Sequence, residues 1–522
     1  MVRDGSESVR RVLQLVMVMC LAATACSTHG ASSTGGKDRT FTPIWGKETD
    51  PAGINPMKAG DVHAWEIFSL VYEPLTRPNK DLTVGPGLAV SWTQSSDTSW
   101  RLRLRPGVKF SNGRPMTSDD VVTTWQAYKK TGVLTSLFPG IDTMRAVDPA
   151  TVDVALKAPV PDLPNRLETF WVLPGKEMTA GSFNPDKDLL GTGPFVSGRH
   201  VKGVSWTFTP NPHYWQPGLP KAKRLDVRFI ADDASRLAAV RTGAVDYAET
   251  ANPDARKILS TDPRVKVVTQ ETTDMYYLKL NSLWSRSKVR DVRVRQAIAL
   301  AIDRKQIVDT ALGGIGQITA ITPRAVPNAC DPAGVIGATG RDVTKAKALL
   351  KEAGVSGLSI RIPVAPAFGA LRAPQIAQVI QQNLNDIGIH TDVAVMDGGA
   401  WLDQAVKGTF DASLNWYTGG GGLSQIMAYL DPTVSAFSAK SDDRDPKNLA
   451  LIRKALKTPA GPNQKQAFAE ACDSVNKLAY FIPLVTKPTM IVYRADRISP
   501  MFAPVEPNQM TFRSLSSFAP AS

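Results

Sequence analysis

The residue types that do most enzyme chemistry are scattered along this chain instead of being gathered into motifs. The sequence contains no HExxH, GxxxxGK[ST], GxSxG or GxGxxG pattern. Ser285 and Lys288 fit the SxxK pattern of penicillin-recognising enzymes, but the SDN partner of that pattern is absent. The five histidines never lie three or four positions apart, so a preformed histidine-rich metal site is not expected. We therefore expect no catalytic residue, no metal and no cofactor.

The N-terminus has the parts of an export signal. Arg10 and Arg11 precede an apolar run over residues 12–23, which is shorter than the roughly 20 residues that a membrane-spanning helix needs. The small residues before Cys26 resemble the lipobox of bacterial lipoproteins, with Ala23 where that pattern usually has Leu. We expect residues 1–25 to be a signal peptide and Cys26 to be lipidated, with residues 26–40 as a flexible linker. A plain secretory signal cleaved nearby is the alternative.

The chain carries a formal net charge of +13. Its basic residues are spread out, as in the strand-like run where Arg101, Arg103 and Arg105 alternate with leucines. This pattern is typical of the solvent face of a strand, so we do not expect a nucleic-acid partner. The positive charge mildly favours an acidic ligand.

Cys330 and Cys472 are the two cysteines expected in the folded body. An exported compartment permits a disulfide, but sequence separation does not fix the Cα distance that the bond requires. A disulfide between them and two buried free thiols therefore both stay open.

The spacing of apolar residues predicts an α/β fold. Residues 358–364 and 389–395 alternate apolar with polar positions, and residues 374–387 between them have helical spacing. Strand, helix and strand with short connections predict a right-handed crossover and a parallel strand pair. Pro374 is expected to open this helix, and Gly388 to follow its end.

Three more helices are predicted from their ends. Asp291 is a plausible N-cap for a helix over residues 292–302, and another helix is expected over residues 344–354. Thr117 and Asp120 have the spacing of a capping box before a third. A chain of 522 residues is long enough for two or three lobes, each with its own core.

Several segments resemble the extracytoplasmic solute-binding proteins of peptide/nickel-type ABC importers, bacterial solute-binding protein family 5. Tyr72-Glu73-Pro74-Leu75 is similar to the family's YEPL block, residues 88–92 to LAxSW, and residues 104–110 to LRxGVKF. Further similar blocks lie at residues 112–121, 191–195, 214–215, 242–246, 280–281 with 292–298, 345–354 and 388–389. The likeness spans about residues 41 to 490, with the blocks in the family's order.

This resemblance implies a two-lobed periplasmic-binding-protein-like α/β fold, with a hinge and an extra subdomain in lobe I. It assigns residues 41–60, 185–280 and 486–522 to lobe I, residues 61–184 to the inserted subdomain, and residues 281–485 to lobe II. It implies no enzyme activity. The expected partners are a small solute, the permease and ATPase subunits of an importer, and the membrane through the lipid anchor. The protein is expected to be an extracytoplasmic monomer.

The resemblance also directs attention to the segment that begins at Trp416. In peptide-binding members an aspartate after this tryptophan holds the peptide's ammonium group, and Gly419 stands at that position here. The expected ligand-binding residues are in two segments: Trp416, Tyr417, Thr418, Gly419 and Gly420 in one, and Trp45, Glu48 and Asp50 near the first strand in the other. Trp45 could equally be core, and the glycine-rich segment could be a surface loop.

Three functions stay open from the sequence. The first is capture of peptides for import, and the second is the same role for an oligosaccharide, a modified peptide or a metal chelate. The third is an envelope enzyme or a binding protein without transport function. Peptides would require an acidic group at the site, sugars would require stacked tryptophans, and a chelate would require Arg or His.

Overall fold

The structure is a computed structural model that describes most of the chain after residue 40. The described residues are 41–59, 62–131, 134–138, 140–250, 252–366, 372–417, 422–433, 435, 439–459, 461–487, 489–499, 505–506 and 518–521. The predictions of a signal peptide, of a linker and of lipidation at Cys26 lie outside them. Among the described helices, none combines the length and the apolar character needed to cross a bilayer.

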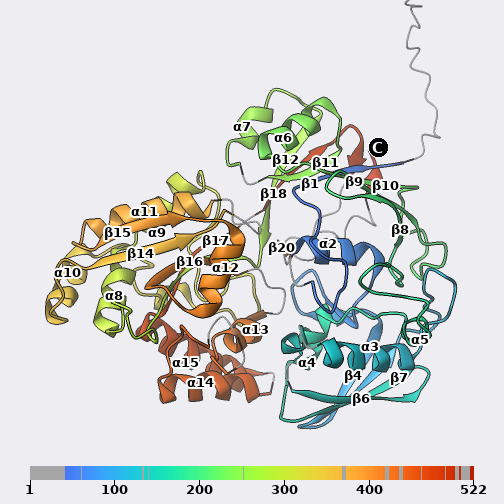
Figure 1. The fold of residues 1–522 in the computed structure, drawn as a ribbon, viewed down its shortest axis with the longest axis horizontal. Coiled ribbons are helices and arrows are strands. Elements are labelled where there is room, and N and C mark those ends of the chain that lie inside the picture. Colours follow the sequence, from blue (N-terminus) through green and yellow to red (C-terminus); the bar gives the residue numbers. More distant parts are fainter. Residues whose placement is uncertain are drawn as a thin grey trace, which may run out of the picture. The chain divides into compact units, whose positions relative to one another are not determined.

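An eight-stranded mixed sheet is built from three separate stretches of the chain, residues 44–47, 195–272 and 489–506 (Figure 1). Its order is β20 (Val505–Glu506), β12 (Val265–Thr272), β18 (Thr489–Arg494), β11 (Tyr247–Thr250), β1 (Ile44–Lys47), β10 (Leu225–Phe229), β9 (Ser205–Pro210) and β8 (Phe195–Val201). The first strand, β1, is therefore central and runs parallel to both β10 and β11. Central parallel strands are covered on both faces, and three of the four residues of β1 are buried.

Helix α6 (Asp233–Thr242) packs on this sheet against β11 and β18. It begins at Asp232, whose side chain accepts a hydrogen bond from Ser235 N, and it ends at Gly243, which has φ +80°. That left-handed conformation suits glycine because it has no Cβ. Helix α7 (Ala255–Leu259) packs on β12.

The segment between β1 and β8 contains a second, smaller sheet in the order β4 (Ala89–Ser96), β5 (Ser99–Leu104), β7 (Thr151–Leu156) and β6 (Ile141–Asp148). Its strands are antiparallel neighbours, and α3 (Ser118–Thr131) packs on β6 and β7 (Figure 1). The remaining elements here are α2 (Val62–Val71), β2 (Thr76–Pro78), β3 (Val84–Pro86), η1 (Thr135–Leu137), α4 (Leu163–Arg166), η2 (Leu167–Thr169) and α5 (Gly175–Thr179).

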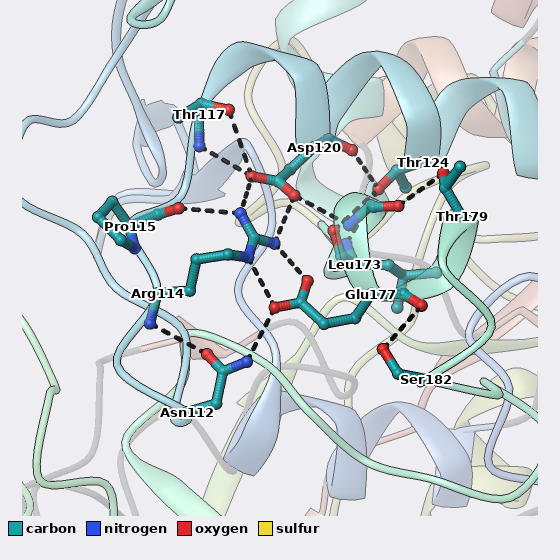
Figure 2. A network of polar contacts seen from close by, with 11 residues as sticks. Asn112, Arg114, Pro115, Thr117, Asp120, Thr124, Leu173, Glu177, Thr179 and Ser182 are labelled. Atoms are coloured by element: carbon teal, nitrogen blue, oxygen red, sulfur yellow. Dashed lines mark hydrogen bonds and ion pairs between the residues drawn. The ribbon is translucent and has the colours of Figure 1, made fainter.

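Figure 2 shows how one predicted block is fixed in this segment. Arg114 lies between two acids, with Nη2 2.7 Å from Asp120 Oδ1 and 2.6 Å from Glu177 Oε2. Asp120 Oδ2 also accepts a hydrogen bond from Thr117 N, as expected at the start of this helix. Asn112 adds a bond to Glu177. These residues are therefore part of the scaffold.

A third sheet joins strands from distant parts of the chain, in the order β16 (Ala412–Tyr417), β13 (Met275–Leu280) and β17 (Phe481–Thr486). Residues 275–280, which were expected in lobe I, thus pair with residues 412–417 and 481–486, which were expected in lobe II. All six residues of β13 are buried, so the strand lacks the alternation that could have revealed its neighbours.

The predicted crossover is present next to this sheet. Strands β14 (Ser359–Val364) and β15 (His390–Val395) are parallel, and α11 (Ala373–Asn385) connects them with Pro374 in its first turn. The predicted helices are α8 (Val292–Ala301), with Asp291 as N-cap, and α10 (Val343–Glu352). The other elements are α9 (Arg304–Gln306), η3 (Ile307–Ala311), η4 (Pro332–Gly334), α12 (Gly398–Lys407), α13 (Gly422–Tyr429), α14 (Pro446–Lys457), α15 (Pro462–Leu478), β19 (Ile498–Ser499) and β21 (Ala519–Pro520).

Cys330 and Cys472 form a disulfide with a Cα separation of 6.0 Å. The bond joins the loop before η4 to α15, and both cysteines are buried in one apolar cluster with Phe468 and Tyr480. It ties together two positions that are 142 residues apart in sequence.

Candidate functional site

The C-terminal end of β1 carries a buried ionic contact with α2. Lys47 is 3% exposed, and its Nζ donates hydrogen bonds to Glu66 Oε2 and to His63 Nδ1, the latter at 3.0 Å. Burial, with the charges of Lys47, Lys487 and Arg236, lowers the pKa of His63 to about 2. The Nδ1 atom of the neutral imidazole can therefore accept a hydrogen bond from Lys47 Nζ. This contact fixes α2 against the end of the central strand β1.

Glu249 lies beside this contact on the neighbouring strand. Gly46 is opposite Ala248 in the parallel register of β1 and β11, so Lys47 and Glu249 follow at the same level. The Oε1 atom of Glu249 is buried. Neither Glu249 nor Glu48 has a side-chain hydrogen bond or ion pair with any residue that the structure describes. Two acids at this strand end are thus left without a protein partner.

The environment of Glu249 changes its proton affinity. Burial raises the pKa of Glu249 to about 7, and the charge of Glu48 adds to the rise, whereas Lys47, Lys487 and Arg236 oppose it. A carboxyl group with this pKa is partly protonated near neutral pH. Functional sites are often found where burial and neighbouring charges shift a pKa in this way.

The two other cations near Glu249 are held by groups of their own. Arg236 Nη2 is 2.6 Å from Asp233 Oδ1, and its other nitrogens donate to the carbonyls of residues 230, 231 and 249. Lys487 Nζ is 3.1 Å from Asp274 Oδ2. Lys487 and Asp274 both lie where the chain passes between the eight-stranded sheet and the sheet of β13, β16 and β17.

A second set of site residues lies at the end of β16. Trp416 and Tyr417 are half-buried, and the ring of Trp416 stacks on Trp401 of α12 with centroids 4.8 Å apart. The Oη atom of Tyr417 is buried without a hydrogen-bond partner in the described part of the chain. Burial raises the pKa of Tyr417 above its usual range, whereas the charge of Arg166 on α4 lowers it. The expected contacts of Thr418, Gly419 and Gly420 lie outside the described residues.

The first-strand candidates separate in the structure. Trp45 is 2% exposed and belongs to the main apolar core, so its ring is not offered to a ligand. Asp50 Oδ2 instead makes hydrogen bonds with the β8–β9 hairpin, to His200 Nε2 at 2.8 Å and from Gly203 N at 2.8 Å. Of the three candidates in this segment, only Glu48 is therefore neither part of the core nor hydrogen-bonded through its side chain to another described residue.

Glu249 and the Lys487–Asp274 pair were not among the residues expected at the site from the sequence. Glu249 follows the block at residues 242–246 by three positions, which was the one local signal available. Its position next to Lys47 depends on the pairing of β1 with β11, which are about 200 residues apart in sequence. Among the described residues, no group of three His, Cys, Asp or Glu side chains is arranged to hold a metal ion.

The eight-stranded sheet and the sheet of β13, β16 and β17 are joined by two connections, and charged side chains lie in these connections and at the end of β1. The model of the bacterial extracellular solute-binding proteins, family 5, matches residues 83–440. The chain belongs to this family, whose members are the extracytoplasmic solute-binding proteins of ABC importers.

Relatives and solved structures agree with the family match. The chain is 26% identical over 463 residues to the glutathione-binding protein GsiB of Escherichia coli O1:K1, covering 83% of this chain and 86% of the relative. The structure resembles AgaA of A. tumefaciens R10 in complex with agropinic acid, with TM-score 0.80, 20% identity and coverage of 92% and 99%. It also resembles DppA of Helicobacter pylori in complex with the peptide STSA, with TM-score 0.78, 19% identity and coverage of 92% and 99%. The fold is that of two-lobed periplasmic binding proteins.

Proposed function

We propose that this protein captures peptides outside the cytoplasm and delivers them to the permease of an ABC importer. The observation that carries the proposal is the acid at the site: Glu48 and Glu249 have no protein partner among the described residues. A peptide brings an ammonium group that such carboxylates can bind, and pairing would offset the cost of burying the Oε1 atom of Glu249. GsiB, which is named for binding glutathione, and DppA, which holds a peptide, support the same reading.

The delivery mechanism follows from differential binding. A ligand that contacts both lobes binds the closed arrangement better than an open one, and this difference shifts the population toward closure. The closed form would then be recognised by the permease. No bond needs to be made or broken, which agrees with relatives that are binding proteins and not enzymes.

A non-peptide solute is the second candidate, and agropinic acid in AgaA is the observation in its favour. A sugar would be expected to stack on open tryptophan rings. The stacked pair Trp401 and Trp416 offers little such surface, because Trp401 is 6% exposed and packs with Ala365 and Ala405. The site thus suits a charged ligand better than a neutral sugar.

Native mass spectrometry of residues 41–522 tests the proposal. The protein is measured as purified and again after denaturation, which releases anything bound. Extra masses that fragment as short peptides are the expected result. A single discrete non-peptide mass would favour the second candidate. For an empty protein, thermal-shift screening of peptide pools decides, since ligand at about 100 times Kd stabilises by roughly 2.7 kcal/mol.

We also propose that Cys26 carries lipid, that residues 26–40 are the linker, and that the protein acts as a monomer. Two or more acyl chains would give stable membrane anchoring. Expression of the full chain with Cys26→Ser should move the protein from the membrane fraction to the soluble fraction. Retention in the membrane would contradict lipidation at this position, and light scattering of residues 41–522 tests the monomer.

A further inference from the structure

The charges around Glu249 do not balance within the protein. Each cation that acts on Glu249 already has an acid of its own: Lys47 has Glu66, Lys487 has Asp274, and Arg236 has Asp233. Glu249 and Glu48 are the two acids left over in the described structure. When Glu249 is ionised, this strand end therefore carries surplus negative charge, although the chain as a whole is strongly basic.

We propose that Glu249 and Glu48 together form the subsite that holds the ammonium group of the bound peptide. The inference rests on the proposed function and deepens it. It also answers a question raised by the sequence, in which Gly419 replaces the aspartate expected to hold that group. A cationic group between the two carboxylates offsets the surplus charge and reduces the repulsion between them.

Glu249 is the residue of the pair that the fold positions most firmly. It lies on β11, next to the central strand β1, and Arg236 donates a hydrogen bond from Nε to its backbone carbonyl at 3.1 Å. A site on a strand is held more rigidly than a site on a loop. Glu48 is in the connection directly after β1, so its side chain has more freedom to follow the ligand. The structure therefore makes Glu249 the principal contact and Glu48 the second.

The test uses two probes that differ only in the ammonium group. One is an equimolar pool of synthetic tripeptides with free N-termini, and the other is the same pool after N-acetylation. Binding to residues 41–522 is titrated by native mass spectrometry for the wild type, Glu249→Gln, Glu48→Gln and the double variant. The control is Glu352→Gln, because Glu352 is an exposed acid on α10. Glutamine keeps the size of the side chain and removes the charge, and circular dichroism confirms that each variant is folded.

The wild type and Glu352→Gln should prefer the free pool by about 30-fold or more. Glu249→Gln should lose most of this preference, because its affinity falls for the peptides with free N-termini and not for the acetylated ones. Glu48→Gln should lose less of the preference. If the wild type discriminates and Glu249→Gln discriminates equally well, the subsite lies elsewhere and the inference is wrong, while peptide binding stands. If the wild type binds neither pool, peptide capture itself is wrong, and the subsite falls with it.

Discussion

Lys487 Nζ and Asp274 Oδ2 lie 3.1 Å apart and join the two connections by which the chain passes between its sheets. Asp274 follows β12 and precedes β13, and Lys487 follows β17 and precedes β18. Their backbones are bonded too, since Lys487 N donates to Asp274 O at 2.9 Å. Because both residues are buried, the two connections are held as one unit.

Removing one member of this pair should be costly. Lys487→Met leaves the carboxylate of Asp274 buried without this cation, so we expect a loss of about 3–5 kcal/mol in the free energy of unfolding. Urea denaturation measures it. Lys477→Met is the control, because the pair of Lys477 with Asp473 is exposed and should contribute little. Equal effects of the two substitutions would show that burial does not make the Lys487 pair special.

Glu249 should reduce the stability of the unliganded protein above neutral pH. Its folded-state pKa of about 7 is above the ordinary value of 4.5, so the folded protein keeps a proton that the unfolded chain releases. Stability contributed by this group therefore falls as pH rises from 4.5 to 7 and stays low above that. At pH 8, Glu249→Gln should raise the free energy of unfolding by about 1–3 kcal/mol, and at pH 4 by close to nothing. A gain that does not change with pH would contradict the shifted pKa.

Replacing Tyr417 by Phe should stabilise the unliganded protein and weaken ligand binding. Its Oη is buried without a partner among the described residues, so Tyr417→Phe removes an unsatisfied polar group. We expect the unliganded protein to gain about 1 kcal/mol in urea denaturation. If the hydroxyl meets the ligand, affinity for the retained ligand should fall in the same variant. A loss of stability instead would mean that the hydroxyl is bonded within the protein.

Glu177 should contribute stability that is lost in acid. The hydrogen bond from Arg114 is the main cause that lowers the pKa of Glu177 to about 2, and burial acts against it. This contribution is complete above the ordinary pKa of 4.5 and is lost as pH falls from 4.5 to 2. Glu177→Gln should lower the free energy of unfolding at pH 6 by about 1–3 kcal/mol, with a smaller difference near pH 2. An unchanged difference across this range would exclude Glu177 as the titrating group.

The disulfide between Cys330 and Cys472 closes a long loop. Cross-links of this span stabilise mainly by restricting the unfolded chain, so changing both cysteines to serine should cost about 2–5 kcal/mol. Denaturation with and without reductant measures the effect. Reductant should destabilise the wild type and leave the double variant unchanged. A wild type insensitive to complete reduction would contradict a stabilising role.

Local patterns were enough to predict the elements and the family. The crossover over residues 358–395 and the helix after Asp291 follow from apolar spacing and capping, which act within a few residues. The pairing of β13 with β16 and β17 could not be predicted, because a uniformly buried strand shows no alternation. Glu249 was missed because its position next to Lys47 depends on the register of β11 against β1. The register between two strands that are distant in sequence cannot be predicted from either strand alone.

The position of β18 in the eight-stranded sheet affects when this sheet can fold. Residues 489–494 insert between β11 and β12, which are more than 200 residues earlier in sequence. The ribosome must therefore make nearly the whole polypeptide before this sheet can close, and pairing over such distances is slow. Until residues 489–494 have been made, β11 and β12 lack the strand that separates them, so the eight-stranded sheet stays incomplete during most of synthesis.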